Sequence, residues 1–190
     1  AARRAGNEFQ FMMLAEENIE LLNGIKARKI VTTCPHCMKS LNEYKDMELD
    51  KNFEIVHHAE FINDLIAVGK IKPTGTVESK TVYHDACYLS RYQAPAGHKQ
   101  PRDLLRKTGA SLVEAKRNKD ESFCCGAGGG MLFSEETEGT RINHDRTLEL
   151  AGTGAKTIAT SCPFCHLMIK DALNDKGIDG VEVKDLTEFL

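Results

Sequence analysis

The amino-acid sequence predicts an α/β fold in which two related sub-domains, each with a small parallel sheet flanked by helices, come from an internal duplication. The first observation is that short apolar runs rich in β-branched residues alternate with segments whose apolar residues recur at helical spacing. Such alternation is typical of parallel sheets with helical crossovers. The second observation is a repeat. A shift of 128 residues superposes residues 20–37 on residues 148–165, with eight of 18 positions identical.

The duplication also predicts the domain organisation. Residues 1–72 match only the C-terminal part of the repeat, so we expect a truncated first copy there. Residues 80–190 form the complete second copy, and residues 73–79, which are polar and contain Pro and Gly, are expected to link the two. The counterparts of the earlier part of the second copy fall before residue 1. The sequence is therefore expected to be a fragment of a longer chain.

The expected secondary structure follows from the apolar pattern, element by element. The first helix is expected over residues 5–23, because Met12 and Ile19 share one face and an Asn-Gly pair closes the segment. A second helix is expected after Pro35, since proline is favoured in the first turn of a helix. The remaining helices are expected over residues 59–68, 101–108, 134–151 and 163–175. The expected strands are the short apolar runs 28–33, 53–57, 81–84, 112–114, 156–160 and 181–183.

Composition narrows the class of protein. Of the 190 residues, 41% are hydrophobic and 28% are charged, which is ordinary for a globular protein. The net charge of −3 without a block of like charges argues against a nucleic-acid partner, and no apolar run in this sequence is long enough for a membrane span. Seven cysteines without a secretory signal indicate a reducing compartment and metal or redox use. A cytoplasmic location is expected.

The cysteines are the candidate functional residues. The second copy holds five of them, at Cys87, Cys124, Cys125, Cys162 and Cys165. Two gaps of 36 residues separate the first from the adjacent pair and the pair from the closing Cys-Pro-Phe-Cys. An odd number of thiols argues against a disulfide set, and soft thiolates select zinc, Cu(I) or iron–sulfur centres. In the first copy, Cys34 and Cys37 are the counterparts of the last two.

The surroundings of these cysteines favour metal binding. Cys34, Cys87 and Cys162 follow expected strands, and ligands of parallel α/β sheets bind beyond the carboxyl ends of the strands. The helix that begins after each Cys-x-x-Cys turn offers free N–H groups and a positive dipole end, which favour the thiolate. Gly126 and Gly128, which follow the cysteine pair, let the backbone approach a cofactor closely and are further candidates for contacting it.

The spacing Cys-x36-Cys-Cys-Gly-x35-Cys-x2-Cys resembles the CCG motif of the cysteine-rich domain of heterodisulfide reductase subunits and related iron–sulfur oxidoreductases. The local sequences that carry the resemblance are Tyr83-His-Asp-Ala-Cys87, Phe123-Cys124-Cys125-Gly126 and Ser161-Cys162-Pro-Phe-Cys165. The likeness covers one complete motif in the second copy and the end of another in the first.

The resemblance implies an oxidoreductase subunit that holds a [4Fe–4S] cluster, which in heterodisulfide reductase is of a non-cubane type. Carried over by position, the implied ligands are Cys87, Cys124, Cys125, Cys162 and Cys165. Cys34 and Cys37 would belong to a partial first motif, whose second cluster would be shared with chain upstream of residue 1. Such subunits pass electrons from a flavoprotein or ferredoxin-type donor to a quinone or disulfide acceptor. Partner domains would bring the module to the cytoplasmic face of the membrane.

Several alternatives stay open. The cluster of such a domain can be the site of disulfide reduction itself instead of a relay. Zinc bound by the two Cys-x-x-Cys units would make a structural module, but it leaves Cys87 and the adjacent pair unexplained. A thioredoxin-like role fits Cys34-Pro-His-Cys37 best. His84 lies three residues before Cys87 and is expected either beside the ligands or in an ordinary hydrogen-bonded site. The same two interpretations apply to His57-His58, which would lie at the first-copy site.

Overall fold

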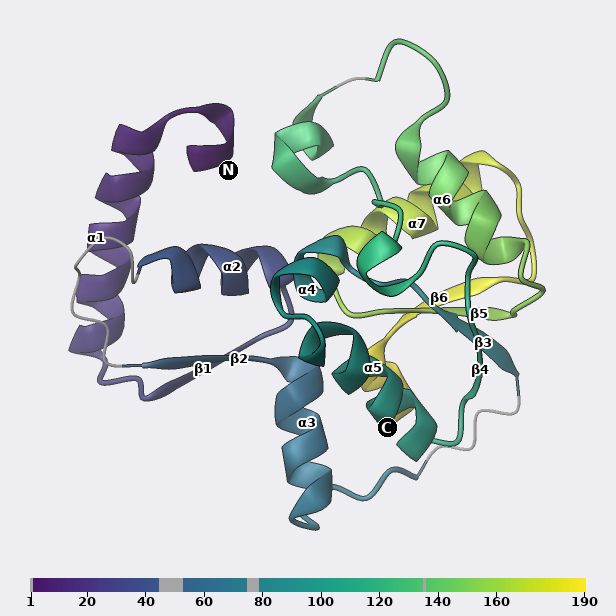
Figure 1. Cartoon of the computed structure of the whole chain (residues 1–190), viewed down its shortest axis with the longest axis horizontal. Helices are drawn as coiled ribbons and strands as arrows, with labels where there is room; N and C mark the ends of the chain where they lie inside the picture. The colour runs from purple at the N-terminus through teal and green to yellow at the C-terminus, as the bar shows by residue number, and fades with distance from the viewer. Residues whose placement is uncertain (1, 45–52, 75–78, 135) are drawn as a thin grey trace.

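The computed structural model describes residues 2–44, 53–74, 79–134 and 136–190. It confirms the α/β fold, with two parallel sheets flanked by helices. Figure 1 shows the smaller sheet beside α1 and α2, the larger sheet beside α6 and α7, and α4 and α5 between the sheets in this view. Each half of the chain thus has its own parallel sheet, although the duplication itself stays a prediction. Within the described parts of the chain, every helix is too short or too polar to cross a bilayer.

The first sheet pairs β1 (Lys29–Thr32) with β2 (Glu54–His57) in parallel, with Val31 opposite Val56. Helix α2 (Pro35–Glu43) lies between these strands in the sequence and follows β1 directly. Helix α1 (Glu8–Gly24) packs its buried face against the C-terminal end of α2. The buried side chains of this contact are Phe11, Ala15, Ile19 and Tyr44.

The second sheet has four parallel strands in the order β4-β3-β5-β6. The two inner strands, β3 (Lys80–Tyr83) and β5 (Thr157–Thr160), are nearly or completely buried, as expected where helices cover both faces of a parallel sheet. The edge strands are β4 (Ser111–Val113) and β6 (Glu182–Asp185), and both are more exposed. The helices of this half are α4 (Cys87–Tyr92), α5 (Ala96–Lys107), α6 (Ile142–Ala151) and α7 (Pro163–Asp175). Short 3-10 turns cover Arg3–Ala5, Lys119–Glu121, Gly128–Phe133 and Leu186–Phe189.

Helix α3 (His58–Ala67) joins the two halves. Its buried Ala59 and Ile62 belong to the same apolar cluster as Leu104 and Leu105 of α5. A first-half helix therefore completes the core of the second half. The predicted division into residues 1–72 and 80–190 stays a prediction, and residues 75–78 of the predicted linker lie outside the described residues.

Two expected helices differ from the structure, and one helix was not expected. The helix expected over residues 134–151 begins only at Ile142, because Gly139 takes a positive φ of 70° and the Glu136 carboxylate accepts the Ile142 N–H at 2.9 Å. The helix expected at residues 101–108 begins earlier, at Ala96, and holds Pro101 inside it. Helix α4 was not predicted at all, since its six residues are too few to show a helical period.

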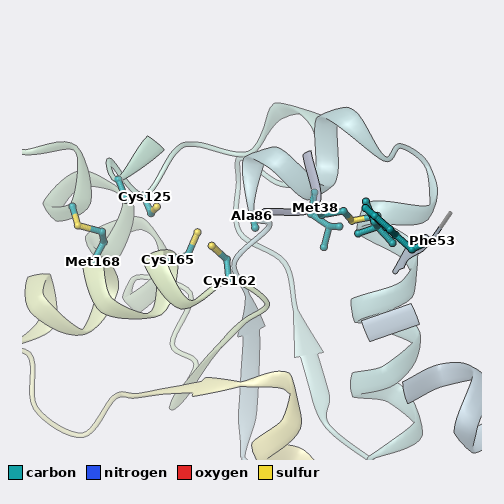
Figure 2. Packing of buried hydrophobic residues seen from close by; sticks show 10 residues of the cluster. Met38, Phe53, Ala86, Cys125, Cys162, Cys165 and Met168 are labelled. Atoms are coloured by element: carbon teal, nitrogen blue, oxygen red, sulfur yellow. The ribbon is translucent and has the colours of Figure 1, made fainter. Parts of the chain in front are cut away.

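An apolar cluster that includes three cysteines lies between the two halves. It combines Met38, Phe53 and Ile55 of the first half with residues of the second half. The second-half members are Ala86, Leu89, Cys125, Ala127, Cys162, Cys165 and Met168. Figure 2 shows the side chains of Cys125, Cys162 and Cys165 directed toward one another inside this cluster.

Candidate metal centre

The two Cys-x-x-Cys units occupy equivalent positions at strand ends. Cys34 follows β1 and is the residue before the first turn of α2, and Cys162 stands in the same relation to β5 and α7. A proline follows each of them as the first helical residue, where its missing N–H costs nothing. The carbonyls of Cys34 and Cys162 accept the first helical hydrogen bonds, at 3.0 and 2.9 Å. The predicted placement at carboxyl ends of strands is confirmed for both.

The remaining cysteines are placed by the segment that follows β3. Cys87 is the first residue of α4, and the Cys124–Cys125 pair lies in a loop held against Asp85. Ser122 Oγ donates to the carbonyl oxygen of Asp85 at 2.7 Å, and the Lys119 N–H donates to its carboxylate at 2.9 Å. A buried aspartate thus ties the loop of the cysteine pair to the turn that carries Cys87.

Each of the seven thiols lies close enough to the next to shift its pKa, so the thiols form one continuous series. The order of contact is Cys37, Cys34, Cys162, Cys165, Cys125, Cys124 and Cys87. The structure therefore brings together the five predicted second-copy residues and adds the two first-copy residues to the same set. Cys34, Cys125, Cys162 and Cys165 are buried, whereas Cys37 is exposed. The repeat had placed Cys37 and Cys34 beside a site of their own, and the direct contact between Cys34 and Cys162 was not predicted.

Neighbouring thiols shift one another's pKa. The thiols of Cys162 and then Cys37 lower the pKa of Cys34, and those of Cys125 and then Cys87 lower the pKa of Cys124. The neighbouring Cys124 raises the pKa of Cys125 to about 11. Binding a metal through the whole set would therefore release protons from the thiols whose pKa is raised, as thiolate ligation requires.

Gly126 directly follows the cysteine pair, and its contact with a cofactor stays a prediction. Its N–H donates to the sulfur of Cys124 at 3.3 Å, and its φ of +92° is a conformation that glycine adopts without strain. A Cβ at this position would lie 3.3 Å from Cβ of Ile142, so the packing is close as well. The backbone N–H of Gly128 also helps to lower the pKa of Cys124, and a Cβ at Gly128 would meet His36 and Tyr88 at ordinary distances.

His36, to which the sequence assigned no role, lies against the thiols. Its Nδ1 is 3.9 Å from the sulfur of Cys34 and 3.9 Å from that of Cys162. The imidazole ring packs on Tyr88, with centroids 4.2 Å apart, and edge-on against Phe164 at 5.3 Å. These three rings also line a cavity of about 120 Å³. The described lining of the cavity contains no cysteine, and His36 links the cavity to the sulfurs of Cys34 and Cys162.

The other histidines divide in a way that the sequence left open. His84 is buried beside the thiols, and a ring nitrogen of His84 and the sulfurs of Cys125 and Cys165 lie within 4.8 Å of one another. Burial, and then the charge of Arg146, lowers the pKa of His84 well below its usual range. His57 instead donates its Nε2–H to the carbonyl of Ser161 at 3.0 Å.

Arg146 is a site residue that sequence reasoning missed. Its side chain is fully buried, and its Nε donates to Nδ1 of His84 at 3.0 Å. The signal that could have found it is spacing: Arg146 lies four residues before Leu150, on the face of α6 that enters the core. A charged residue on such a face is almost never buried without a partner.

The donor set fits an iron–sulfur cluster better than a single zinc ion. Seven neighbouring thiols are the soft ligands that iron–sulfur clusters take, and the buried backbone N–H of Gly126 already donates to the sulfur of Cys124. One tetrahedral zinc ion would use four of the thiols and leave the rest without a role.

Comparison with protein families gives a match in two stretches of the chain. The family described as "Cysteine-rich domain" (CCG) matches residues 1–42 and 81–170. The two stretches contain all seven cysteines.

Curated relatives with similar sequences are iron–sulfur and quinone-linked oxidoreductases by name. The chain is 37% identical to the EtfAB:quinone oxidoreductase of Syntrophomonas wolfei, over 100% of the chain and 27% of that protein. It is 38% identical to the probable iron-sulfur-binding oxidoreductase FadF of Bacillus subtilis, over 99% of the chain and 26% of that protein. Identity is 32% to a component of the dihydromethanophenazine:CoB–CoM heterodisulfide reductase of Methanosarcina mazei, over 93% of the chain and 43% of that component. The chain thus spans about a quarter of the length of the first two relatives.

Proposed function

This chain belongs to the CCG family of cysteine-rich domains, and on that premise we propose that it is the iron–sulfur electron-transfer module of an oxidoreductase. The observation that carries the proposal is the single contiguous set of thiols between the two halves. Relatives named as iron–sulfur and quinone oxidoreductases support a redox role for that set.

The proposed cofactor is a [4Fe–4S] cluster held by Cys87, Cys124, Cys125, Cys162 and Cys165. When bound, it would supply one-electron transfer at a potential tuned by hydrogen bonds to its sulfurs. The chain's own contribution is to hold the thiolates at strand and helix ends, to donate the Gly126 N–H to Cys124, and to exclude water by burial. Cys34 and Cys37 would belong to a second, partial iron–sulfur site beside this one.

The proposed partners follow from the same role. A flavoprotein or ferredoxin-type protein would donate electrons, and a quinone or a disulfide would accept them. The named quinone oxidoreductase among the relatives supports the quinone. The module would work at the cytoplasmic face of the membrane through partner domains, and residues 1–72 and 80–190 would be its two repeats.

Serine variants of the cysteines test the ligand set. Cys165→Ser removes a completely buried thiol at the centre of the chain of contacts, and we expect it to abolish the cluster's absorbance and its EPR signal on reduction. Cys37→Ser removes the exposed thiol at the end of that chain and is the matched control, because the proposed five ligands stay intact. Equal iron and sulfide content in wild-type protein and Cys165→Ser would refute the ligand assignment.

A second candidate function, direct disulfide reduction at the cluster, is favoured by the cavity beside His36. Reducing one disulfide to two thiols takes two electrons and two protons, so a reduced donor protein must deliver electrons in two steps. Anaerobically reduced protein, at two equivalents per disulfide so that two clusters supply the two electrons and the solvent supplies the two protons, would release thiols from a small organic disulfide and recover its oxidised spectrum. His36→Phe replaces the imidazole between the cavity and the thiols with a ring that cannot donate a proton, and it should suppress this reaction while the iron content is unchanged. No thiol release from reduced wild-type protein would exclude the second function.

A further inference from the structure

His84 has one ring nitrogen engaged and one without a partner. It lies at the end of β3 and is 1% exposed. Nδ1 accepts the hydrogen bond from Nε of Arg146 at 3.0 Å. Among the described residues, Nε2 is buried and has no hydrogen-bond partner. With Nδ1 taken, Nε2 is the nitrogen left to face the sulfurs of Cys125 and Cys165, which lie within 4.8 Å of the ring.

The contact with Arg146 decides where the imidazole proton is. A guanidinium stays protonated in proteins and has no acceptor, so its Nε–H must donate. The Nδ1 atom of His84 therefore accepts, and a neutral imidazole that accepts at one nitrogen carries its proton at the other. Nε2 is then an N–H donor without a free lone pair. It cannot be a metal ligand, although its position beside two thiols would suit one.

Arg146 is held in place by contacts that do not involve the cysteines. Its Nη1 donates to the carbonyl of Arg117 at 2.9 Å and to the carboxylate of Glu149 at 3.1 Å. Glu149 also accepts the Arg117 N–H at 2.7 Å, which closes the network. The guanidinium cannot turn away from His84 without breaking these bonds, so the imidazole orientation is fixed before any cofactor binds.

We propose that His84 donates its Nε2–H to a sulfur of the iron–sulfur site at Cys125 or Cys165, and that Arg146 is the positioning residue that fixes this donor. The inference rests on the proposed function, since it needs a redox-active cluster to act on. A hydrogen bond to a ligand sulfur stabilises the more negative, reduced state and raises the reduction potential. A direct ligand at the same position would instead replace a thiolate.

Substitutions at His84 separate a donor from a space filler. His84→Leu removes the donor, and we expect the equilibrium constant for cluster reduction to fall about tenfold, a shift of about 59 mV for a one-electron couple. His84→Gln keeps a side-chain N–H and should retain most of the wild-type potential. His144→Leu is the control: His144 lies on the same helix as Arg146, but its ring nitrogen contacts the Asp175 carboxylate at 3.1 Å instead of the thiols. Its potential should equal that of the wild type.

The wild-type protein provides a second test that does not depend on a variant folding. In 15N-histidine-labelled protein with a reduced cluster, electron–nuclear double resonance should show an exchangeable proton from an N–H donor and only a weak nitrogen coupling. Arg146→Met should weaken that proton signal. A strong nitrogen coupling, typical of direct ligation, would overturn the inference. So would a His84→Leu potential equal to that of the wild type in protein with full iron content. Absence of iron from the wild-type protein would instead overturn the proposed function together with this inference.

Discussion

Removing Arg102 is expected to be among the most damaging single changes to this fold. Arg102 of α5 donates to both carboxylate oxygens of Asp85, at 2.7 and 2.8 Å, and the side chains are 4% and 0% exposed. The same guanidinium binds Glu114 at 2.7 and 2.8 Å, but the Glu114 side chain is 42% exposed. The substitution Arg102→Met would leave Asp85 buried, with the Lys119 N–H as its remaining donor to the carboxylate.

The size of the stability loss depends on which of the two carboxylates is accessible to water. Losing Glu114 should cost less than about 1 kcal/mol, because water replaces the ion pair of an exposed side chain. Leaving Asp85 without its cation should cost about 3–5 kcal/mol, as for other buried pairs broken on one side. The buried pair therefore dominates. A loss of about 4 kcal/mol is a large part of the roughly 5–15 kcal/mol that stabilises a typical domain.

Urea unfolding followed by circular dichroism measures this loss. Arg106→Met is the matched control: Arg106 lies on the same helix, is 61% exposed and pairs with Asp103 at 3.1 Å, so its removal should cost less than about 1 kcal/mol. Adding Asp85→Asn to Arg102→Met should recover part of the loss, because no unpaired charge stays buried. A free energy of unfolding for Arg102→Met within about 1 kcal/mol of wild type would refute the reasoning.

Three further predictions concern backbone fit and pH. Gly126→Ala should lower the free energy of unfolding by about 1–3 kcal/mol and reduce iron retention, because it combines strain at positive φ with close packing. Gly139→Ala is the control, since it has the strain but open space around the new Cβ. Equal iron content in the two variants would contradict this prediction. Gly97→Ala should cost about 3 kcal/mol or more in thermal unfolding, because its Cβ would overlap the carbonyl oxygen of Leu89; an unchanged melting temperature would count against it. Burial, and then the neighbouring histidine, lowers the pKa of His57 to about 4, so the unfolded chain binds the extra proton first as the pH falls. The free energy of unfolding should therefore drop by about 2 kcal/mol between about pH 6.5 and pH 5, and His57→Gln should remove that part of the drop.

The fold and the local placement of the cysteines were predictable because they depend on short-range signals. The apolar run ending at Thr160 and the proline after Cys162 mark a strand and a helix start within a few residues of each other. The same pattern around Cys34 made the strand-end position predictable in the first half. The helix predicted over residues 134–151 was too long. The prediction relied on the apolar spacing and gave no weight to Gly139, whose positive φ interrupts a helix.

The contacts across the site could not be predicted, because they depend on how distant elements pack. Cys34 meets Cys162 because two apolar clusters, one around Met38 and one between α3 and α5, pack the first half against the second. His84 finds Arg146 across 62 positions of sequence, and no local pattern links a strand end to the buried face of a later helix. A single sequence shows which residues can bind a metal, whereas packing decides which of them meet.

Metal and sulfide analysis of anaerobically purified wild-type protein tests the central claim most directly. The account predicts iron and acid-labile sulfide in equal amounts, about four of each per chain for one [4Fe–4S] cluster, with an EPR signal on reduction. Zinc at about one per chain, with neither iron nor sulfide, would contradict it and leave the thiols as a structural site.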